Sequence, residues 1–288
     1  MTPVERVRAS MTPLESLSTG VRPHLVFLAG VRAVIFDIYG TLLISAAGDI
    51  SLVSDSESER GMANALRILG SAGSGEQVDA ALQSYRSEIL LLQKEARSQG
   101  EEFPEVEIRE VWKAIASRWN LSEERIEEAA LVYECAVNPC DAMPGSSEVI
   151  RILREKSYLL GIISNAQFYT EAVVEGASGI ELSGGDFEQA ISIFSYEEGV
   201  GKPSRSLFEK ASSNAGKLGL KPEEVLYIGN DWAKDIEPAG EVGFKTALFA
   251  GDQRSLRTGA LTPDEACRKA DVVLTELIQL VEVLRLNK

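Results

Sequence analysis

Short apolar runs rich in β-branched residues recur along this chain and predict buried strands. They occupy the segments Val31–Phe36, Tyr158–Ile163, Ala190–Phe194, Val225–Ile228, Phe244–Phe249 and Asp271–Leu274. Amphipathic segments such as Ser147–Glu155 and Ser204–Ala215 lie between the later runs and predict helices. Because strands and helices alternate, we expect a doubly wound α/β core, a parallel sheet covered by helices on both faces.

Residues 45–138 interrupt this alternation with helical patterns alone. The predicted helices cover Ser58–Leu69, Glu76–Arg97, Val106–Trp119 and Glu123–Cys135. The chain should therefore divide into a polar N-terminal extension over residues 1–30, an α/β core built from residues 31–44 and 139–288, and an α-helical cap inserted over residues 45–138. We expect no catalytic role for the first 20 residues, which repeat Met-Thr-Pro and lack a clear apolar period.

Composition and charge limit the kinds of molecule that the protein is expected to bind. The 288 residues are 44% hydrophobic and 25% charged, as in ordinary globular proteins, and the formal net charge of −15 disfavours nucleic acids and anionic membranes. No apolar stretch approaches the roughly 18 residues of a membrane span. The three cysteines form no pairing motif, which favours a reducing compartment. We expect a cytoplasmic protein with a small-molecule substrate, and leave open whether it forms a homodimer.

Polar residues follow several of the predicted strands. In doubly wound sheets, reactive groups gather beyond the carboxyl ends of the strands. Asp37 directly follows the first strand, where a carboxylate could act as a nucleophile, and a lysine between a glycine and a proline could be held beside it. The other members of this set are Ser164, Asn165, Lys202, Asn230, Asp231 and Asp235.

Each member of the set has a simpler interpretation when taken alone. Ser164 and Asn165 could cap a helix or form a turn, Lys202 could be solvated, and Asp231 or Asp235 could cap the helix that follows. Carboxylate oxygens near Asp37 would also suit Mg²⁺. The case for a site comes from the order of the motifs, since all of them appear in sequence with a helical insertion after the first.

The segment Phe36-Asp37-Ile38-Tyr39-Gly40-Thr41 resembles the DxDGT signature of the haloacid dehalogenase superfamily. The whole pattern, over about residues 31–280, is similar to the subgroup with a helical cap between its first and second motifs. The resemblance implies a Rossmann-like core and an aspartyl nucleophile. It implies these roles: Asp37 as nucleophile, Thr41 as support of the motif loop, Ser164 as the group that holds a substrate oxygen, and Lys202 as the group that orients Asp37. From its position after the strand, the Asn165 amide could add a second donor to that oxygen.

In the phosphatase branch of this superfamily, the resemblance implies that Mg²⁺ binds Asp37, the backbone carbonyl of Tyr39 and an acid after Gly229. Asn230 stands at the usual position of that acid. The remaining metal ligand is therefore open among Asn230, Asp231 and Asp235.

Tyr39 stands at the position of the second acid of the motif, and this difference bears on which of the family's reactions the chain can catalyse. In the family's phosphatases that acid protonates the leaving oxygen and then activates water. A phenol with a reference pKa near 10 cannot easily perform the second task. We predict a Mg²⁺-dependent phosphatase on a small phosphorylated metabolite, slow with alkyl phosphates and less impaired with acyl or aryl phosphates.

Two alternatives remain. A metal-free 2-haloacid dehalogenase is favoured by Tyr39, because the family's dehalogenases carry tyrosine there and halide departure needs no proton. Asp231 and Asp235 weigh more heavily against it, since added carboxylates would repel a carboxylate substrate unless a cation lay between them. The second alternative is a catalytically degenerate binding or scaffold protein.

Overall fold

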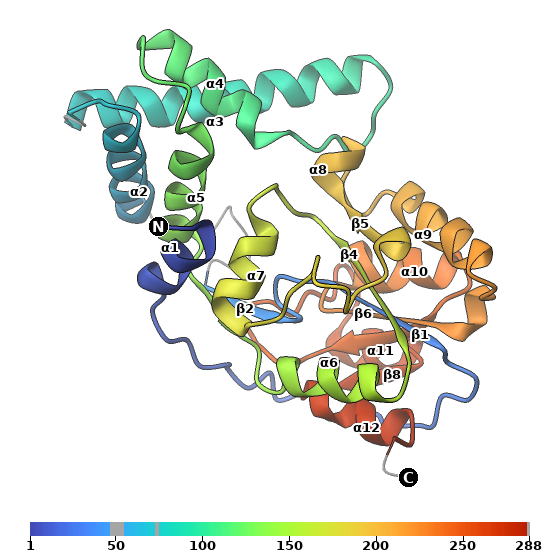
Figure 1. Ribbon diagram of the computed structural model, residues 1–288. Coiled ribbons are helices and arrows are strands. Elements are labelled where there is room, and N and C mark those ends of the chain that lie inside the picture. The colour runs from blue at the N-terminus through green and yellow to red at the C-terminus, as the bar shows by residue number, and fades with distance from the viewer. Residues whose placement is uncertain (47–54, 73–74, 287–288) are drawn as a thin grey trace.

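The computed structural model describes residues 1–46, 55–72 and 75–286, and its centre is a six-stranded parallel sheet (Figure 1). The strand order is β5-β4-β1-β6-β7-β8. The strands are β1 (Ala33–Phe36), β4 (Leu159–Ser164), β5 (Ser192–Phe194), β6 (Val225–Gly229), β7 (Lys245–Phe249) and β8 (Val272–Leu274). All six lie where the apolar runs predict them, which confirms the α/β fold class.

Residues of β1 point alternately to two apolar cores. Val34 and Phe36 pack on one face, and Ala33 and Ile35 on the other. The first face is covered by α6 (Ser146–Glu155), α7 (Thr170–Ser178), η5 (Leu277–Gln279) and α12 (Leu280–Val283); the second is covered by α9 (Arg205–Lys217) and α10 (Glu237–Glu241). Burial on both faces explains why the strand sequences are continuously apolar.

Shorter elements complete the core. They are α8 (Ser195–Glu198), α11 (Pro263–Lys269), the 3-10 helices η2 (Gln189–Ile191) and η3 (Pro222–Glu224), and the π-helix η4 (Trp232–Ile236). A small antiparallel pair, β2 (Leu43–Ser45) and β3 (Cys140–Ala142), joins the two ends of the inserted segment. Its three-residue strands are too short to give a periodic signal.

The inserted segment consists of four helices in its described part. They are α2 (Asp55–Ile68), α3 (Gly75–Ser98), α4 (Ile108–Arg118) and α5 (Ile126–Val137). Figure 1 shows them gathered at one end of the molecule, away from the sheet. Tyr85, Trp112 and Tyr133 pack against one another with ring centroids 5.0–5.6 Å apart, which gives this group its own aromatic core.

The N-terminal extension packs against the rest of the chain. Its helix α1 (Pro3–Ser10) lies beside α7 and α5, with Val7 only 3% exposed (Figure 1). Farther along, His24 and Val273 exchange two backbone hydrogen bonds of 2.9 Å, so the extension pairs with β8. Within the described ranges, every helix is too short or too polar to cross a membrane.

Candidate active site

A tight loop carries Asp37 away from the centre of the sheet. The Asp37 N–H donates to the carbonyl of Ile228 in β6 at 2.9 Å. The Ile38 carbonyl accepts hydrogen bonds from the N–H groups of Thr41, Leu42 and Leu43, which closes the turn. Gly40 has a φ of +86°, and a Cβ there would lie 2.6 Å from the Cβ of Ser255. The loop therefore needs glycine at this position, both for its backbone conformation and for space.

The Asp37 carboxylate is held through one oxygen. Ser164 Oγ donates to Oδ1 at 2.7 Å, and Lys202 Nζ lies 2.8 Å from the same atom. Within the described residues, the second oxygen, Oδ2, accepts no hydrogen bond from the protein. The residue is 7% exposed and lines a cavity. Asp37 is thus fixed in orientation while one carboxylate oxygen is available to a ligand, as a nucleophile requires.

Lys202 bridges two carboxylates. Its ammonium lies 2.6 Å from Oδ1 of Asp235, in addition to its contact with Asp37. Burial opposes the charge on Lys202, but the carboxylates of Asp235 and Asp37 outweigh burial and raise its pKa above the ordinary value. Asn165 accepts from the Lys202 N–H at 2.6 Å and donates to its carbonyl at 3.3 Å. Asn165 therefore positions the backbone of the lysine.

Tyr227 belongs to this network and was not predicted from the sequence. Its hydroxyl lies 3.0 Å from Oδ1 of Asp235, 3.0 Å from the Ile163 carbonyl and 3.3 Å from Lys202 Nζ. The signal that could have identified it is a tyrosine in the middle of an apolar strand, because a buried phenol needs a hydrogen-bond partner.

The three candidate metal ligands after β6 have different environments. Asn230 Oδ1 accepts from Thr41 Oγ1 at 3.0 Å, and its amide donates to the Ser255 carbonyl at 2.7 Å. Asp235 has no exposed surface, and its Oδ2 accepts from the Asp231 N–H at 3.0 Å. Both side chains are thus engaged within the protein. The Thr41 hydroxyl thus connects the motif loop to the loop after β6.

All three line the cavity, but Asp231 differs from the other two because it is partly exposed. Its Oδ1 caps η4 by accepting from the Lys234 N–H at 3.0 Å, and its other oxygen accepts no hydrogen bond from the described residues. The π-helical turn carries Asp235 back beneath the strand end, where a Cβ on Gly229 would lie 2.4 Å from the Asp235 carboxyl carbon. Two acids four residues apart therefore face different surroundings.

The cavity beside Asp37 has a volume of about 940 Å³ and is lined by both the core and the insert. On the core side it is lined by Asp37, Tyr39, Ser164, Asn165, Lys202, Asn230, Asp231 and Asp235, among others. On the insert side it is lined by Ser45, Tyr85, Ile89, Gln93, Glu105, Val106, Ile108, Glu134 and Asn138. The predicted site residues are thus gathered at one cavity, except that Thr41 lies behind it.

Tyr39 is fixed at the wall of this cavity. Its hydroxyl lies 3.1 Å from Thr170 Oγ1. Burial, with a contribution from the charge of Glu134, raises the pKa of Tyr39 well above the ordinary value of 10. The phenol therefore stays protonated in the physiological range and cannot serve as a base.

One stretch of the insert, between α3 and α4, is bonded to the core loops that carry the site. The Phe103 carbonyl accepts from the Gly201 N–H at 2.8 Å, and the Glu105 N–H donates to the Gly199 carbonyl at 3.0 Å. Gln167 donates to the Val106 carbonyl at 2.7 Å. These bonds end on the loops that carry Lys202 and Asn165.

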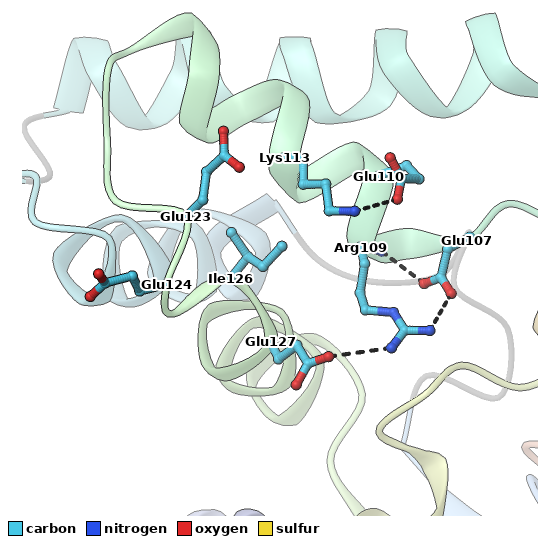
Figure 2. Close-up of a pocket in the computed structure, with 8 residues that line it drawn as sticks. All are labelled: Glu107, Arg109, Glu110, Lys113, Glu123, Glu124, Ile126 and Glu127. Atoms are coloured by element: carbon cyan, nitrogen blue, oxygen red, sulfur yellow. Dashed lines mark hydrogen bonds and ion pairs between the residues drawn. The ribbon is translucent and has the colours of Figure 1, made fainter.

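A second hollow of about 460 Å³ lies on the insert, between α4 and the start of α5 (Figure 2). Arg109 pairs there with Glu107 at 2.6 Å and with Glu127 at 3.3 Å, and Lys113 pairs with Glu110 at 2.6 Å. None of the predicted site residues lines it. We therefore place the candidate site at the cavity that holds Asp37.

Comparison with known proteins identifies the family. A sequence profile of haloacid dehalogenase-like hydrolases matches residues 31–243. The chain belongs to this family of hydrolases. Over 143 residues, the chain is 32% identical to a glyceraldehyde 3-phosphate phosphatase from Pyrococcus furiosus. The match covers 49% of this chain and 54% of that protein. The chain spans about half the length, or less, of the curated relatives it matches.

Solved structures agree on the fold. A haloacid dehalogenase-family phosphatase from Thermococcus onnurineus is 19% identical with a TM-score of 0.52, over 88% of this chain and 97% of that one. A 2-haloacid dehalogenase from Pseudomonas syringae is 20% identical with a TM-score of 0.55 over the same shares, 88% and 97%. The TM-scores support a shared fold, and identities this low do not distinguish phosphatase from dehalogenase activity.

Proposed function

We propose that this hydrolase is a Mg²⁺-dependent phosphatase that acts on a small phosphate monoester through an aspartyl phosphate. The observation that carries the proposal is Asp231, a second carboxylate on the wall of the cavity that holds Asp37, with one oxygen that no described residue hydrogen-bonds. Two such groups favour a cation between them and disfavour a carboxylate substrate. The similarity to a named phosphatase supports the same choice.

In the first step, Oδ2 of Asp37 attacks phosphorus and the ester P–O bond breaks. The alcohol leaves with a proton from water, because the Tyr39 phenol is a poor acid. In the second step, water attacks phosphorus, the bond to Asp37 breaks, and inorganic phosphate and the free carboxylate are produced. Ser164 and Lys202 hold Oδ1 throughout, and the Lys202 ammonium offsets the charge of the incoming phosphoryl group.

The residues present fit Mg²⁺. The candidate ligands are the Asp37 carboxylate, the second oxygen of Asp231 and the Tyr39 carbonyl, which accepts no hydrogen bond from the described residues. Mg²⁺ usually takes one or two carboxylates and completes its shell with carbonyls and waters. When bound, the ion would neutralise charge on the phosphoryl group.

The leaving group should determine the rate. Because Tyr39 cannot act as a base and donates a proton weakly, alkyl phosphates lack the assistance that an acid at this position would give, typically about 10²- to 10⁴-fold. Aryl and acyl phosphates need less assistance. We therefore expect turnover of p-nitrophenyl phosphate and acetyl phosphate to exceed that of alkyl phosphates.

A second candidate function is metal-free 2-haloacid hydrolysis, which Tyr39 favours. The experiment measures turnover of p-nitrophenyl phosphate and of 2-chloropropionate, each with Mg²⁺ and with EDTA. Phosphate release that EDTA abolishes supports the phosphatase, and halide release in EDTA overturns it. Asp37→Asn should abolish either activity. Full activity in Asp37→Asn would refute the nucleophile, and no activity on either substrate would favour a degenerate binding protein. The cytoplasmic location and the homodimer stay predictions.

A further inference from the structure

A buried carboxylate lies on the insert side of the cavity. Glu134, on α5, is 9% exposed and lines the cavity that holds Asp37. Its Oε1 accepts from the Asn138 amide at 3.1 Å, and its Oε2 accepts from the Tyr169 hydroxyl at 3.0 Å. A carboxylate oxygen can accept more than one hydrogen bond, so each oxygen retains capacity for a ligand.

Glu134 lacks a compensating charge. Its contacts are with an amide and a phenol, and no lysine, arginine or histidine of the described residues neutralises it. Burial accordingly raises the pKa of Glu134, even though the bonds from Asn138 and Tyr169 act in the opposite direction. Buried acids are normally paired. A cation brought by the substrate would supply the missing partner.

The two sides of the cavity differ in charge. Among the described lining residues of the insert there are two carboxylates, Glu105 and Glu134, and no lysine or arginine. The lining cations, Lys202, Lys234 and Arg257, all belong to the core. A phosphate at Asp37 would therefore lie near the cations, while the remainder of the substrate would face negative charge.

We propose that Glu134 binds an ammonium group on the non-phosphate part of the substrate, so that aminoalkyl phosphates are preferred among alkyl phosphates. This inference rests on the proposed phosphatase function. An ammonium brings three donors and a positive charge, whereas a hydroxyl brings no charge. A carboxylate or a second phosphate would be repelled by Glu134 and Glu105.

The test compares three series of phosphate esters of matched chain length. Ethyl, propyl and butyl phosphates are measured against their ω-amino and ω-carboxy counterparts, with p-nitrophenyl phosphate as the reference. For at least one length, we expect kcat/KM of the amino ester to exceed that of the neutral ester by about 10- to 100-fold, the usual effect of a hydrogen bond to a charged group. The carboxy ester should be the poorest.

Glu134→Gln, which keeps the shape of the side chain, should reduce this preference, the ratio of kcat/KM for the amino and neutral esters, to about 1. The matched control is Glu127→Gln, on the same helix at the outer hollow of Figure 2, which should keep the preference. Equal kcat/KM for amino and neutral esters in the wild type overturns the inference and leaves the phosphatase intact. Failure to hydrolyse p-nitrophenyl phosphate refutes both. The wild-type comparison decides the matter even if Glu134→Gln does not fold.

Discussion

The ammonium of Lys202 lies 2.6 Å from the carboxylate of Asp235, a residue with no exposed surface. Asp235 is therefore a positioning residue for Lys202, which in turn holds Asp37. Asp231, four residues earlier, lines the cavity and is available to a ligand. The two acids should respond differently to the same conservative substitution, and this difference tests the assignment of the metal ligand.

Asp235→Asn should lower the free energy of unfolding by about 3–5 kcal/mol, because it removes one partner of a buried ion pair. Asp231→Asn should lower it by no more than about 1 kcal/mol, through weakening of a helix cap. Urea denaturation followed by circular dichroism measures both. Equal losses of stability would contradict the distinction between the two carboxylates.

Asp231→Asn should instead raise the Mg²⁺ concentration needed for half-maximal phosphatase activity. The increase should be at least about tenfold, since loss of even an outer-sphere partner commonly has that effect. A Mg²⁺ titration of p-nitrophenyl phosphate turnover gives the value. An unchanged Mg²⁺ requirement would show that Asp231 is not the metal ligand.

Tyr39→Asp should raise turnover of alkyl phosphates by at least about tenfold, because it supplies the acid–base group whose effect is typically 10²- to 10⁴-fold. Aryl phosphates should gain less, since their leaving groups need less protonation. Propyl phosphate and p-nitrophenyl phosphate are compared in the same preparation. If turnover of propyl phosphate does not rise, the absence of an acid at position 39 does not explain slow turnover of alkyl phosphates.

The preference for aminoalkyl phosphates should increase with pH. Burial raises the pKa of Glu134, so the carboxylate that binds an ammonium forms only as the pH rises through that raised value. The other titratable groups that feel the charge of Glu134 are buried, and burial raises the pKa of each, which keeps them neutral: Tyr39, Tyr85, Tyr133, Tyr169, Cys135 and Cys140. The measurement is the ratio of kcat/KM for aminopropyl and propyl phosphate across pH, compared with the same ratio in Glu134→Gln, which controls for titration of the two phosphates. A ratio independent of pH would contradict a role for Glu134.

Stability should show the opposite dependence on pH. The folded state binds the Glu134 proton more tightly than the unfolded state, in which the pKa has its ordinary value of 4.5. As the pH rises above 4.5, Glu134 therefore lowers the free energy of unfolding. Glu134→Gln removes the effect. The variant should therefore be more stable relative to the wild type at pH 8 than at pH 4, as measured by urea denaturation without substrate. Glu127→Gln again serves as the control.

Much of the fold could be predicted because each strand is a continuous apolar run, and the parallel topology then placed Asp37, Ser164 and Asp231 at one edge of the sheet. The separate environments of Asp231 and Asp235 could not be predicted, because they depend on a π-helical turn that has no periodic signal. Glu134 was also missed. It is one of 44 acidic residues, and only its position on the cavity side of the insert distinguishes it.

The bonds of Phe103 and Glu105 to the core have a consequence for heat inactivation. These bonds end on Gly199 and Gly201, immediately before Lys202, so the insert cannot move outward without pulling on the loop that holds the lysine. Loosening of the insert should then abolish turnover while the sheet is still folded. We expect the temperature of half-inactivation to lie below the midpoint of the main unfolding transition.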